Sequence, residues 1–392
     1  MTKITDIPAI RFKGFSDTWE QRKLSEIATM HARIGWQNLR TSEFLDNGDY
    51  MLITGTDFMD GAVNFDTCHY VERERYEQDK HIQIRNGSIL ITKDGTLGKV
   101  AYIQGLTMPA TLNAGVFNVE IRDEKEVDNR YLFQYLKAPF LMDYVDKKAT
   151  GGTIKHLNQN ILVDFPVVLP QKDEQAKIGE YFLGIDNLIT LHQRKYDKLT
   201  NVKKSMLEKM FPQNGSNVPE IRFKGFTEAW EQRKLGEIGS VSMCRRIFKE
   251  QTSENGEIPF YKIGTFGGEA DAFISRELFE EYKAKYQYPK KGDILISASG
   301  SIGRTVVFTG KNEYFQDSNI VWLNHDKHLD NSFLKCFYSI VKWAGIEGST
   351  IKRLYNDNIL NTAITLPSVE EQQKIGAYFE NLDNLITLHQ CE

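Results

Sequence analysis

Two short segments combine a glycine turn with a cation, an arrangement that can hold a phosphate group. In each, an apolar run leads into Gly-x-x-Gly and directly into a basic residue, in Gly95-Thr-Leu-Gly-Lys99 and in Gly300-Ser-Ile-Gly-Arg304. Such a turn exposes backbone N–H groups beside the positive charge, and both attract phosphate oxygens. A tight turn after a core strand would also explain the glycines. Because this turn and its basic residue recur in two regions that otherwise differ, we favour a role in a contact that both regions make.

A second shared element carries the same argument, because Thr153-Ile-Lys155 recurs as Thr350-Ile-Lys352. Candidates for reading base edges lie instead in loops that differ between the regions: 31–40 and 54–57, then 243–249 and 265–268. Arginine and asparagine offer the paired donors and acceptors that major-groove readout needs, although each loop could equally be an ordinary solvated one. The predicted DNA-contacting residues are His31, Arg33, Trp36, Arg40, Thr54, Thr56, Lys93, Lys99, Lys155, Arg245, Arg246, Lys249, Lys262, Thr265, Arg304, Lys352 and Arg353.

Motifs for catalysis or cofactor binding are missing from the sequence. It has no G-x-G-x-x-G loop and no Asn-Pro-Pro-aromatic motif, and Gly98-Lys99 lacks the leading glycine of an NTPase phosphate loop. Glu281-Tyr-Lys283 has a nuclease-like spacing but lies in a helical run. The four cysteines are scattered, and the histidines do not have the paired spacing of a metal-binding motif. We therefore expect no catalytic site, no bound cofactor and no metal.

Composition describes a water-soluble globular chain. Its 392 residues are 41% hydrophobic and 26% charged, which predicts two or three domains. No apolar run reaches about 18 residues and no signal sequence opens the chain, so we expect a cytoplasmic protein without a membrane span. The net charge of −4 argues against unselective coating of nucleic acid but leaves site-specific binding open.

The chain contains two tandem repeats of about 200 residues. Residues 8–24 return as 219–235, both containing Ile-Arg-Phe-Lys-Gly-Phe and Trp-Glu-Gln-Arg-Lys-Leu. The aromatic residues Phe12, Phe15 and Trp19 of this leading segment are expected to be structural, packing on the domain or on the helices. Between the repeated ends, short apolar strands mixed with an amphipathic helix predict an α+β globule in each repeat.

Each repeat ends in a block that predicts a long helix. From Pro170 to Met210, large side chains recur at spacings of three and four, which indicates a helix of about 60 Å packed on another helix. Its counterpart begins at Pro367 and is shorter, so the segment from Tyr196 to Met210 is predicted to have no partner within the chain. That segment would be capped by another subunit or frayed. The residues predicted for helix packing and partner docking are Phe182, Ile185, Ile189, His192, Tyr196, Leu199, Met206, Phe379, Leu382, Ile386 and His389.

The phrases PAIRFKGFSDTWEQRKL, ILITKDGTLGKVA, GGTIKHLNQNIL and LPQKDEQAKIGEYFLGIDNLITLHQRK resemble the specificity (S) subunit of type I restriction–modification systems. The resemblance covers almost the whole chain. It implies a pseudo-twofold arrangement of target-recognition domains at 1–169 and 213–366, separated by antiparallel coiled-coil helices at 170–212 and 367–392.

The resemblance further implies a non-catalytic subunit. It would read a bipartite, asymmetric site in double-stranded DNA and carry two methyltransferase (M) subunits that modify adenine N6 with S-adenosylmethionine. Restriction (R) subunits would add ATP- and Mg-dependent translocation and cleavage. The rod could span roughly 17 base pairs at about 3.4 Å each. The alternative is a stand-alone, pseudo-dimeric DNA-binding regulator.

Overall fold

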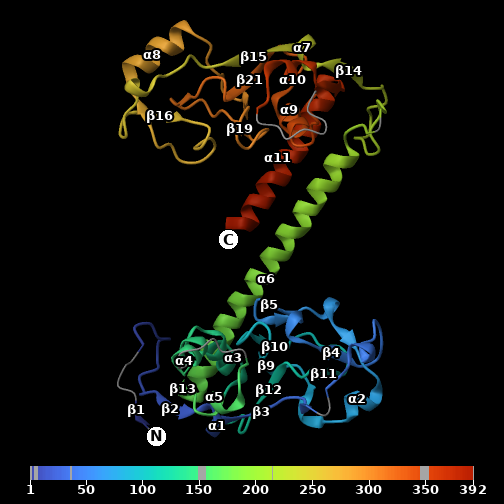
Figure 1. Ribbon diagram of the computed structural model, residues 1–392, viewed down its shortest axis with the longest axis vertical. Helices are drawn as coiled ribbons and strands as arrows, with labels where there is room; N and C mark the ends of the chain where they lie inside the picture. The colour runs from blue at the N-terminus through green and yellow to red at the C-terminus, as the bar shows by residue number, and fades with distance from the viewer. Residues whose placement is uncertain are drawn as a thin grey trace. The chain divides into compact units, whose positions relative to one another are not determined.

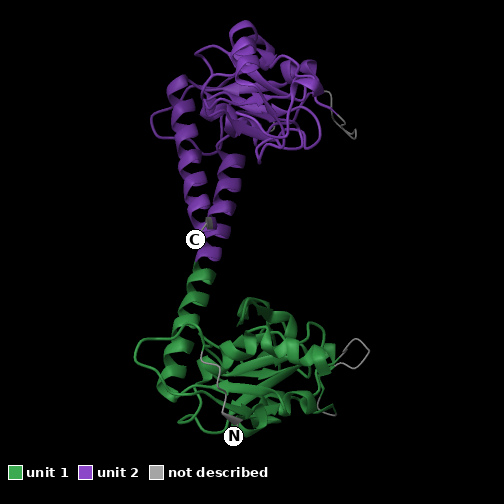
Figure 2. Cartoon of the chain, turned by 90° about the vertical axis from the view of Figure 1, so that its left-hand side faces the viewer, with its two compact units in different colours: residues 1–191 green, residues 192–392 purple. Residues whose placement is uncertain are grey.

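The computed structural model describes residues 2–3, 8–35, 38–148, 156–213, 215–344 and 353–391. The chain divides into two compact units, residues 1–191 and residues 192–392 (Figure 2). Each unit combines small β-sheets with helices, which confirms the predicted α+β class. Within the described residues, no helix is long and apolar enough to cross a membrane.

Unit 1 is built around two four-stranded sheets (Figure 1). One has the order β10-β9-β12-β3 with antiparallel neighbours, and the other has the order β7-β4-β11-β8 with a parallel β4–β11 pair. All four residues of β9 are buried, as expected for a continuous apolar run. The strands of these sheets are β3 (Ala28–His31), β4 (Met51–Ile53), β7 (His69–Tyr70), β8 (Gln83–Ile84), β9 (Ile89–Thr92), β10 (Val100–Tyr102), β11 (Ala110–Leu112) and β12 (Val116–Ile121).

Smaller elements complete unit 1. Strands β1 (Thr2–Lys3), β2 (Glu20–Lys23) and β13 (Pro166–Leu169) form a third sheet, and β5 (Phe58–Met59) pairs with β6 (Ala62–Val63). The helices are α1 (Leu24–Ile27), α2 (Arg73–Glu77), α3 (Asn129–Lys137), α4 (Phe140–Lys148) and α5 (Gln159–Val163), with single 3-10 turns at Thr41–Glu43, Gly55–Asp57, Phe65–Thr67 and Lys80–Ile82.

Unit 2 repeats this plan. Its main sheet has the order β15-β21-β18-β19, a second sheet β17-β16-β20 contains the parallel pair β16–β20, and β14 pairs with β22. The strands are β14 (Glu231–Lys234), β15 (Gly239–Met243), β16 (Ile258–Tyr261), β17 (Phe273–Ile274), β18 (Ile294–Ser297), β19 (Thr305–Val307), β20 (Tyr314–Phe315), β21 (Ile320–His325) and β22 (Ala363–Leu366). The helices are α7 (Leu235–Ile238), α8 (Arg276–Lys285), α9 (Asn331–Tyr338) and α10 (Asn356–Asn361), with a 3-10 turn at Lys249–Gln251.

The first repeat ends in the exit helix α6 (Lys172–Lys209), and the second ends in the exit helix α11 (Val369–Cys391). The first turn of each exit helix is bound to the leading segment of its own repeat. Arg11 donates two 2.7 Å hydrogen bonds to Glu174, whose side chain is 1% exposed. Arg222 holds Glu371 in the same way at 2.7 and 2.8 Å. Two hydrogen bonds from one guanidinium offset the desolvation cost of burying a carboxylate. The shared Arg is therefore structural.

Aromatic contacts extend this clamp. Phe12 meets Tyr181 edge-on at 5.8 Å, and the ammonium group of Lys177 lies 4.9 Å from the ring centre of Phe15. Phe223 and Tyr378 form the matching pair in unit 2 at 6.1 Å. The prediction that the leading segment packs on the helix is thus confirmed.

Each exit helix also approaches a second helix closely. A Cβ at Gly179 would lie 2.6 Å from the backbone nitrogen of Tyr131 in α3, and a Cβ at Gly376 would lie 1.8 Å from Ser332 Oγ in α9. Only glycine permits this approach, because no real side chain fits at such distances.

The second part of α6 belongs to unit 2, where it packs antiparallel on α11 (Figure 2). His192 Nδ1 lies 3.1 Å from His389 Nδ1, and Lys203 donates a hydrogen bond to Asp383, so the pairing runs in opposite directions along the two helices. Met210 is 3% exposed within the core of unit 2. The prediction that Tyr196 to Met210 has no partner within the chain is therefore wrong.

The predicted seam residues that are exposed lie in the first half of α6. Phe182 is 46% and Ile189 is 58% exposed, and Ile185 is half-buried, although all three were predicted to lie in the helix seam. Antiparallel packing explains the difference, because the start of α11 pairs with the end of α6 and not with its start. The remaining predicted seam residues do lie in unit 2, buried or half-buried: His192, Tyr196, Leu199, Met206, Phe379, Leu382, Ile386 and His389.

We predict that Gly179→Ala destabilises unit 1, because the new methyl group would push α6 away from the backbone of α3. Overpacking of this kind costs about 1–3 kcal/mol. The control is Gly184→Ala in the same helix, where nothing lies within 4 Å of a new Cβ and the higher helix propensity of alanine should raise stability slightly. Differential scanning calorimetry should show a lower melting temperature than that of the wild type only for Gly179→Ala. Equal shifts for both variants would contradict the close approach.

Asp383 should make the helix pair of unit 2 sensitive to acid. Burial opposes its ionisation, but hydrogen bonds from Lys203 and Lys335 outweigh burial and lower the pKa of the carboxyl below its ordinary value of 3.8. Its contribution to stability is therefore present above the unfolded-state pKa and lost as pH falls through the folded-state pKa. Thermal unfolding should show Asp383→Asn less stable than the wild type at about pH 6, with the difference shrinking toward about pH 3. As a control for the loss of a carboxylate from α6, Asp197→Asn changes an exposed residue and should leave stability at about pH 6 nearly unchanged.

Candidate nucleic-acid interface

The two glycine turns have the same geometry. Thr92 N–H donates to Lys99 O at 2.9 Å and Gly98 N–H donates to Thr92 O at 2.9 Å, while Thr92 Oγ1 bonds Thr96 O. In unit 2, Ser297 makes the corresponding bonds with Arg304, Gly303 and Ser301. The glycines that end the turns, Gly98 and Gly303, have positive φ angles of 71° and 82°. The expected Gly-x-x-Gly turn is present twice.

The backbone N–H groups that end the turns are already used within the chain. Lys99 N–H donates to Thr92 Oγ1 and Arg304 N–H donates to Ser297 Oγ, each at 2.9 Å. The expectation that these amides are free to bind phosphate is therefore wrong for the last two residues of each turn. The side chains of Lys99 and Arg304 remain exposed, so the cation and not the turn amide is available to an anion.

The second shared element lies against the same turn. Leu157 N–H donates to Lys93 O at 2.8 Å, and Leu354 N–H donates to Ala298 O at 2.7 Å. His156 lies 2.5 Å from Asp94, and the matching Arg353 donates to Ser318 O at 2.8 Å. The predicted contacts Lys155 and Lys352 immediately precede these residues but lie outside the described residues, as does Trp36.

The divergent loops adjoin the turns as well. A Cβ at Gly55 would lie 3.1 Å from the methyl group of Thr92, so the loop at 54–57 borders the turn of unit 1. In unit 2, Arg304 Nη2 donates to Gly267 O at 3.3 Å, which ties the loop at 265–268 to the turn. Each unit thus brings a cation-bearing turn and a divergent loop together, although they are far apart in sequence.

The segment at 316–319 was not among the predicted contacts. Ala298 N–H donates to Asn319 O at 2.7 Å, and Ser299 Oγ donates to the amide oxygen of Asn319 at 2.8 Å. Ser318 has a φ of 52°, an unusual value for a non-glycine residue. The only sequence signal that could have pointed to this segment as a contact is a polar run between two apolar strands, but such runs are common in ordinary turns.

Most predicted cations of unit 2 already have partners within the unit. The guanidinium of Arg245 lies 5.2 Å from the ring centre of Tyr286, Arg246 pairs with Asp317 at 2.9 Å, and Lys262 pairs with Asp271 at 2.9 Å. The predicted residues that are exposed are Arg40, Thr56, Lys99, Arg245, Arg246, Lys249 and Arg304, and those that are half-buried are His31, Thr54, Lys93, Lys262, Thr265 and Arg353.

Arg33 differs from the other predicted contacts because its side chain is buried, with 2% exposure. Its guanidinium donates to Leu112 O at 3.0 Å and to Thr111 Oγ1 at 3.3 Å. Burial, together with the nearby charge of Arg75, lowers the pKa of the guanidinium below its ordinary value. The residue supports β11 from within the domain and is left out of the proposed interface.

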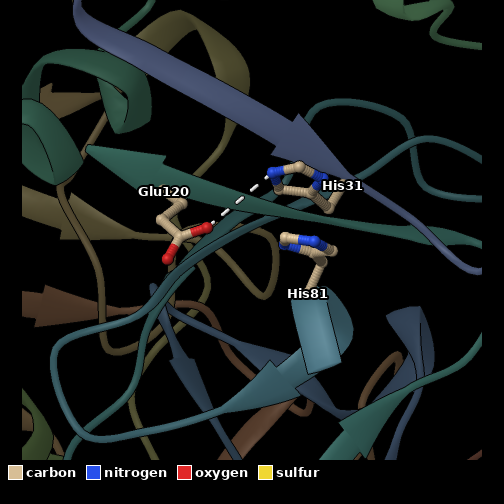
Figure 3. Close-up of side chains that lie close together, drawn as sticks. All are labelled: His31, His81 and Glu120. Carbon is tan, nitrogen blue, oxygen red and sulfur yellow. Dashed lines mark ion pairs between the residues drawn. The ribbon is translucent and has the colours of Figure 1, made fainter. Parts of the chain in front are cut away.

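His31, His81 and Glu120 place three possible metal-ligating atoms within 4.8 Å of one another (Figure 3). The imidazole rings are stacked, with centroids 4.5 Å apart and planes at 19°. A ring nitrogen binds a metal through a lone pair in the ring plane, so nearly parallel rings do not direct their lone pairs at a common point. His31 Nε2 instead lies 3.0 Å from Thr29 Oγ1. We assign no metal to this cluster.

Comparison with known proteins identifies the class to which this fold belongs. Residues 16–201 and 227–392 each match the type I restriction modification DNA specificity domain. The chain belongs to the specificity (S) subunits of type I restriction–modification systems, with two tandem target-recognition domains. This subunit is a non-catalytic component of a type I restriction–modification enzyme.

Individual relatives agree with the family assignment. The chain is 41% identical over 304 residues to a putative type I restriction enzyme specificity subunit of Haemophilus influenzae, covering 76% of each protein. It is 25% identical to the putative MjaX specificity subunit of Methanocaldococcus jannaschii, covering all of this chain and 91% of that one. The crystal structure of the S subunit from M. genitalium has the same fold, with a TM-score of 0.64, 15% identity and coverage of 100% and 94%.

Proposed function

We propose that this chain reads a bipartite, asymmetric DNA target and thereby directs the other subunits of a type I restriction–modification complex. The observation that carries the proposal is the repeated junction of a cation-bearing turn with a divergent loop in each unit. Phosphates are common to all DNA, so a shared cation suits them, whereas different base sequences call for different loops. One half of the target is read by each unit.

In unit 1, Lys99 contacts the DNA backbone, and Arg40, Thr54 and Thr56 reach base edges. The hydroxyl groups of Thr54 and Thr56 lie 2.7 Å apart, and that of half-buried Thr54 donates to Asp57 Oδ2 at 2.9 Å. The exposed Thr56 hydroxyl can turn to a base instead. In unit 2, Arg304 and Arg353 contact the backbone, and the base readers are Arg245, Arg246, Lys249, Lys262 and Thr265.

Two M subunits dock on the exit helices. Leu188 and Leu191 of α6 are 56% and 46% exposed, and their counterparts 197 residues on, Leu385 and Leu388, are 45% and 50% exposed (188 to 385, 191 to 388). An apolar surface that recurs at equivalent positions suits two copies of one partner. These leucines were not among the predicted docking residues, because they lie beside the three-and-four stripe and not on it.

The catalytic steps belong to the partners in this proposal. M subunits bind S-adenosylmethionine and methylate adenine N6, and R subunits use ATP and Mg for translocation and cleavage. The helices α6 and α11 set the spacer between the two half-sites.

The decisive test is genome-wide mapping of N6-methyladenine in a host that expresses this chain with a cognate M subunit. We expect a split motif with a non-specific spacer. Replacing residues 25–165 with those of a relative of different specificity should change one half-site and preserve the other. A continuous motif, or a change in both halves, would refute the proposal.

The turn cations should contribute affinity without sequence preference. In the complex with M subunits, Lys99→Ala and Arg304→Ala should each weaken binding to specific and non-specific DNA alike, and each should reduce the salt dependence by about one ion. Fluorescence anisotropy over a series of salt concentrations measures both effects. Lys125→Ala removes an exposed lysine that follows the far end of β12, and it should leave the slope unchanged. A loss confined to the specific sequence would instead make these residues base readers.

A further inference from the structure

A basic hollow lies in unit 2, where the end of α8 leads toward β18 (Figure 1). It has a volume of about 760 Å³, and its charged and aromatic lining consists of Lys283, Lys285, Tyr286, Tyr288, Lys290 and Lys291. None of the described residues that line it carries a carboxylate. The segment from 283 to 291 contains four lysines and no acidic residue, although the whole chain has a net charge of −4. Positive charge is therefore concentrated at this place.

The ammonium groups of Lys290 and Lys291 are available to an anion. Both side chains are exposed, and neither forms an ion pair with a described residue. The acid nearest to Lys290 in the sequence is Asp293, whose carboxylate accepts from the backbone N–H of Lys290 at 2.8 Å. Gly310 lines the hollow from the loop after β19, where a Cβ would lie 3.2 Å from the Cβ of Lys291. The loop thus supports the stem of Lys291 without a side chain of its own.

The other two lysines also keep their charge. Lys283 Nζ lies 5.0 Å from the ring centre of Phe279 and 5.2 Å from that of Tyr288, and such contacts leave the ammonium group charged. Lys285 pairs with Glu281 at 2.9 Å, but both side chains are more than half exposed, so water and salt screen the pair. A concave surface with one sign of charge concentrates ions of the opposite sign.

The basic hollow adjoins the segments that are proposed to read DNA. The guanidinium of Arg245 lies 5.2 Å from the ring centre of Tyr286, which lines the hollow. The next residue, Arg246, pairs with Asp317 at 2.9 Å. Asp317 belongs to the segment 316–319, which is hydrogen-bonded to the residues that lead into the glycine turn. Two consecutive arginines therefore connect the hollow with the glycine turn of unit 2.

The distance from the turn to the hollow fits two contacts on one duplex. Arg304 precedes β19 and Gly310 follows it, and the six residues from 304 to 310 span at most about 20 Å. DNA rises about 3.4 Å per base pair. A phosphate bound in the hollow would consequently lie within about six base pairs of one bound by Arg304.

Unit 1 has no equivalent concentration of lysines. Its matching segment, 80–86, leads into Gly87 and contains one lysine and one arginine, Lys80 and Arg85. Arg85 pairs with Glu124 at 3.4 Å, so a carboxylate lies beside one of these two cations. Because the units share their plan in other respects, the basic hollow is a feature of unit 2 alone.

We propose that the basic hollow binds the phosphate backbone of double-stranded DNA beside the half-site that unit 2 reads. The inference rests on the proposed reading of DNA and adds a contact to one half of the target. A lysine ammonium group attracts phosphate as a point charge and reads no base. The hollow therefore contributes affinity without sequence preference, and the DNA contact of unit 2 extends further than its base-reading loops.

The test is phosphate ethylation interference with the complex of this chain and M subunits on a duplex that carries the mapped target. We expect the wild type to need phosphates within about six base pairs of those that depend on Arg304. In the double variant Lys290→Ala, Lys291→Ala, ethylation of these phosphates should no longer weaken binding. The affinity of this variant at low salt should fall about tenfold, and its salt dependence should decrease by about two ions.

The matched control is Lys327→Ala, which removes an exposed lysine of unit 2 that follows the far end of β21. It should change neither the affinity nor the interference pattern. Mapping of N6-methyladenine should give the same motif for the double variant as for the wild type, because a phosphate contact does not select bases.

Four results would overturn the proposal. If the wild type binds its target specifically and the double variant binds it equally well, the hollow does not touch DNA, and the proposed reading of DNA stands. Unchanged DNA affinity with loss of an M or R subunit would make the hollow a protein-binding surface. A changed motif would make these lysines base readers. A wild-type complex without any preference for the mapped target would refute the proposed function and this inference together.

Discussion

The buried ion pair between the leading segment and the exit helix is the contact on which each repeat depends. Glu174 and Glu371 lie in the first turn of their helices, where the helix dipole favours a carboxylate, and each is held by two hydrogen bonds from an arginine. Removing one partner of such a pair leaves a buried charge and costs about 3–5 kcal/mol. The neighbouring Gln175 and Gln372 extend the clamp, since each accepts from the backbone that begins α3 or α9. The leading segment, the domain and the helix are thereby locked as one body in each repeat.

With the first turn held in place, the approach of Gly179 to α3 and of Gly376 to α9 follows, because the helix has no freedom to move outward. The apolar residues further along each helix then face whatever lies beside it. In unit 2 that neighbour is the second part of α6, whereas in unit 1 the same face is open. One duplicated structure thus presents a covered copy and an uncovered copy of the same surface.

The candidate interface depends on tertiary contacts between segments of different kinds. The turn cations are common to both repeats, and the loops beside the turns differ, which is the combination on which the proposed reading of DNA rests. Lys99 and Arg304 stand free of the turn amides, which are bonded to Thr92 and Ser297. Burial removes Arg33 from this surface and makes it a support for β11.

The duplication, the α+β class, the two long helices and the glycine turns could all be predicted from the sequence, because repeats and side-chain periodicity are local patterns. The partner of each helix segment was decided only in the tertiary structure. Equivalent residues of a repeat, such as Phe182 and Phe379, need not face each other when helices run antiparallel, and Tyr196 to Met210 consequently packs where α11 begins. The burial of Arg33 could not be predicted either, since the sequence does not show whether a basic loop residue faces solvent or a carbonyl oxygen. The apolar spacing predicted the long helix α6. The antiparallel direction of α11 decided which apolar residues of α6 are covered and which are exposed.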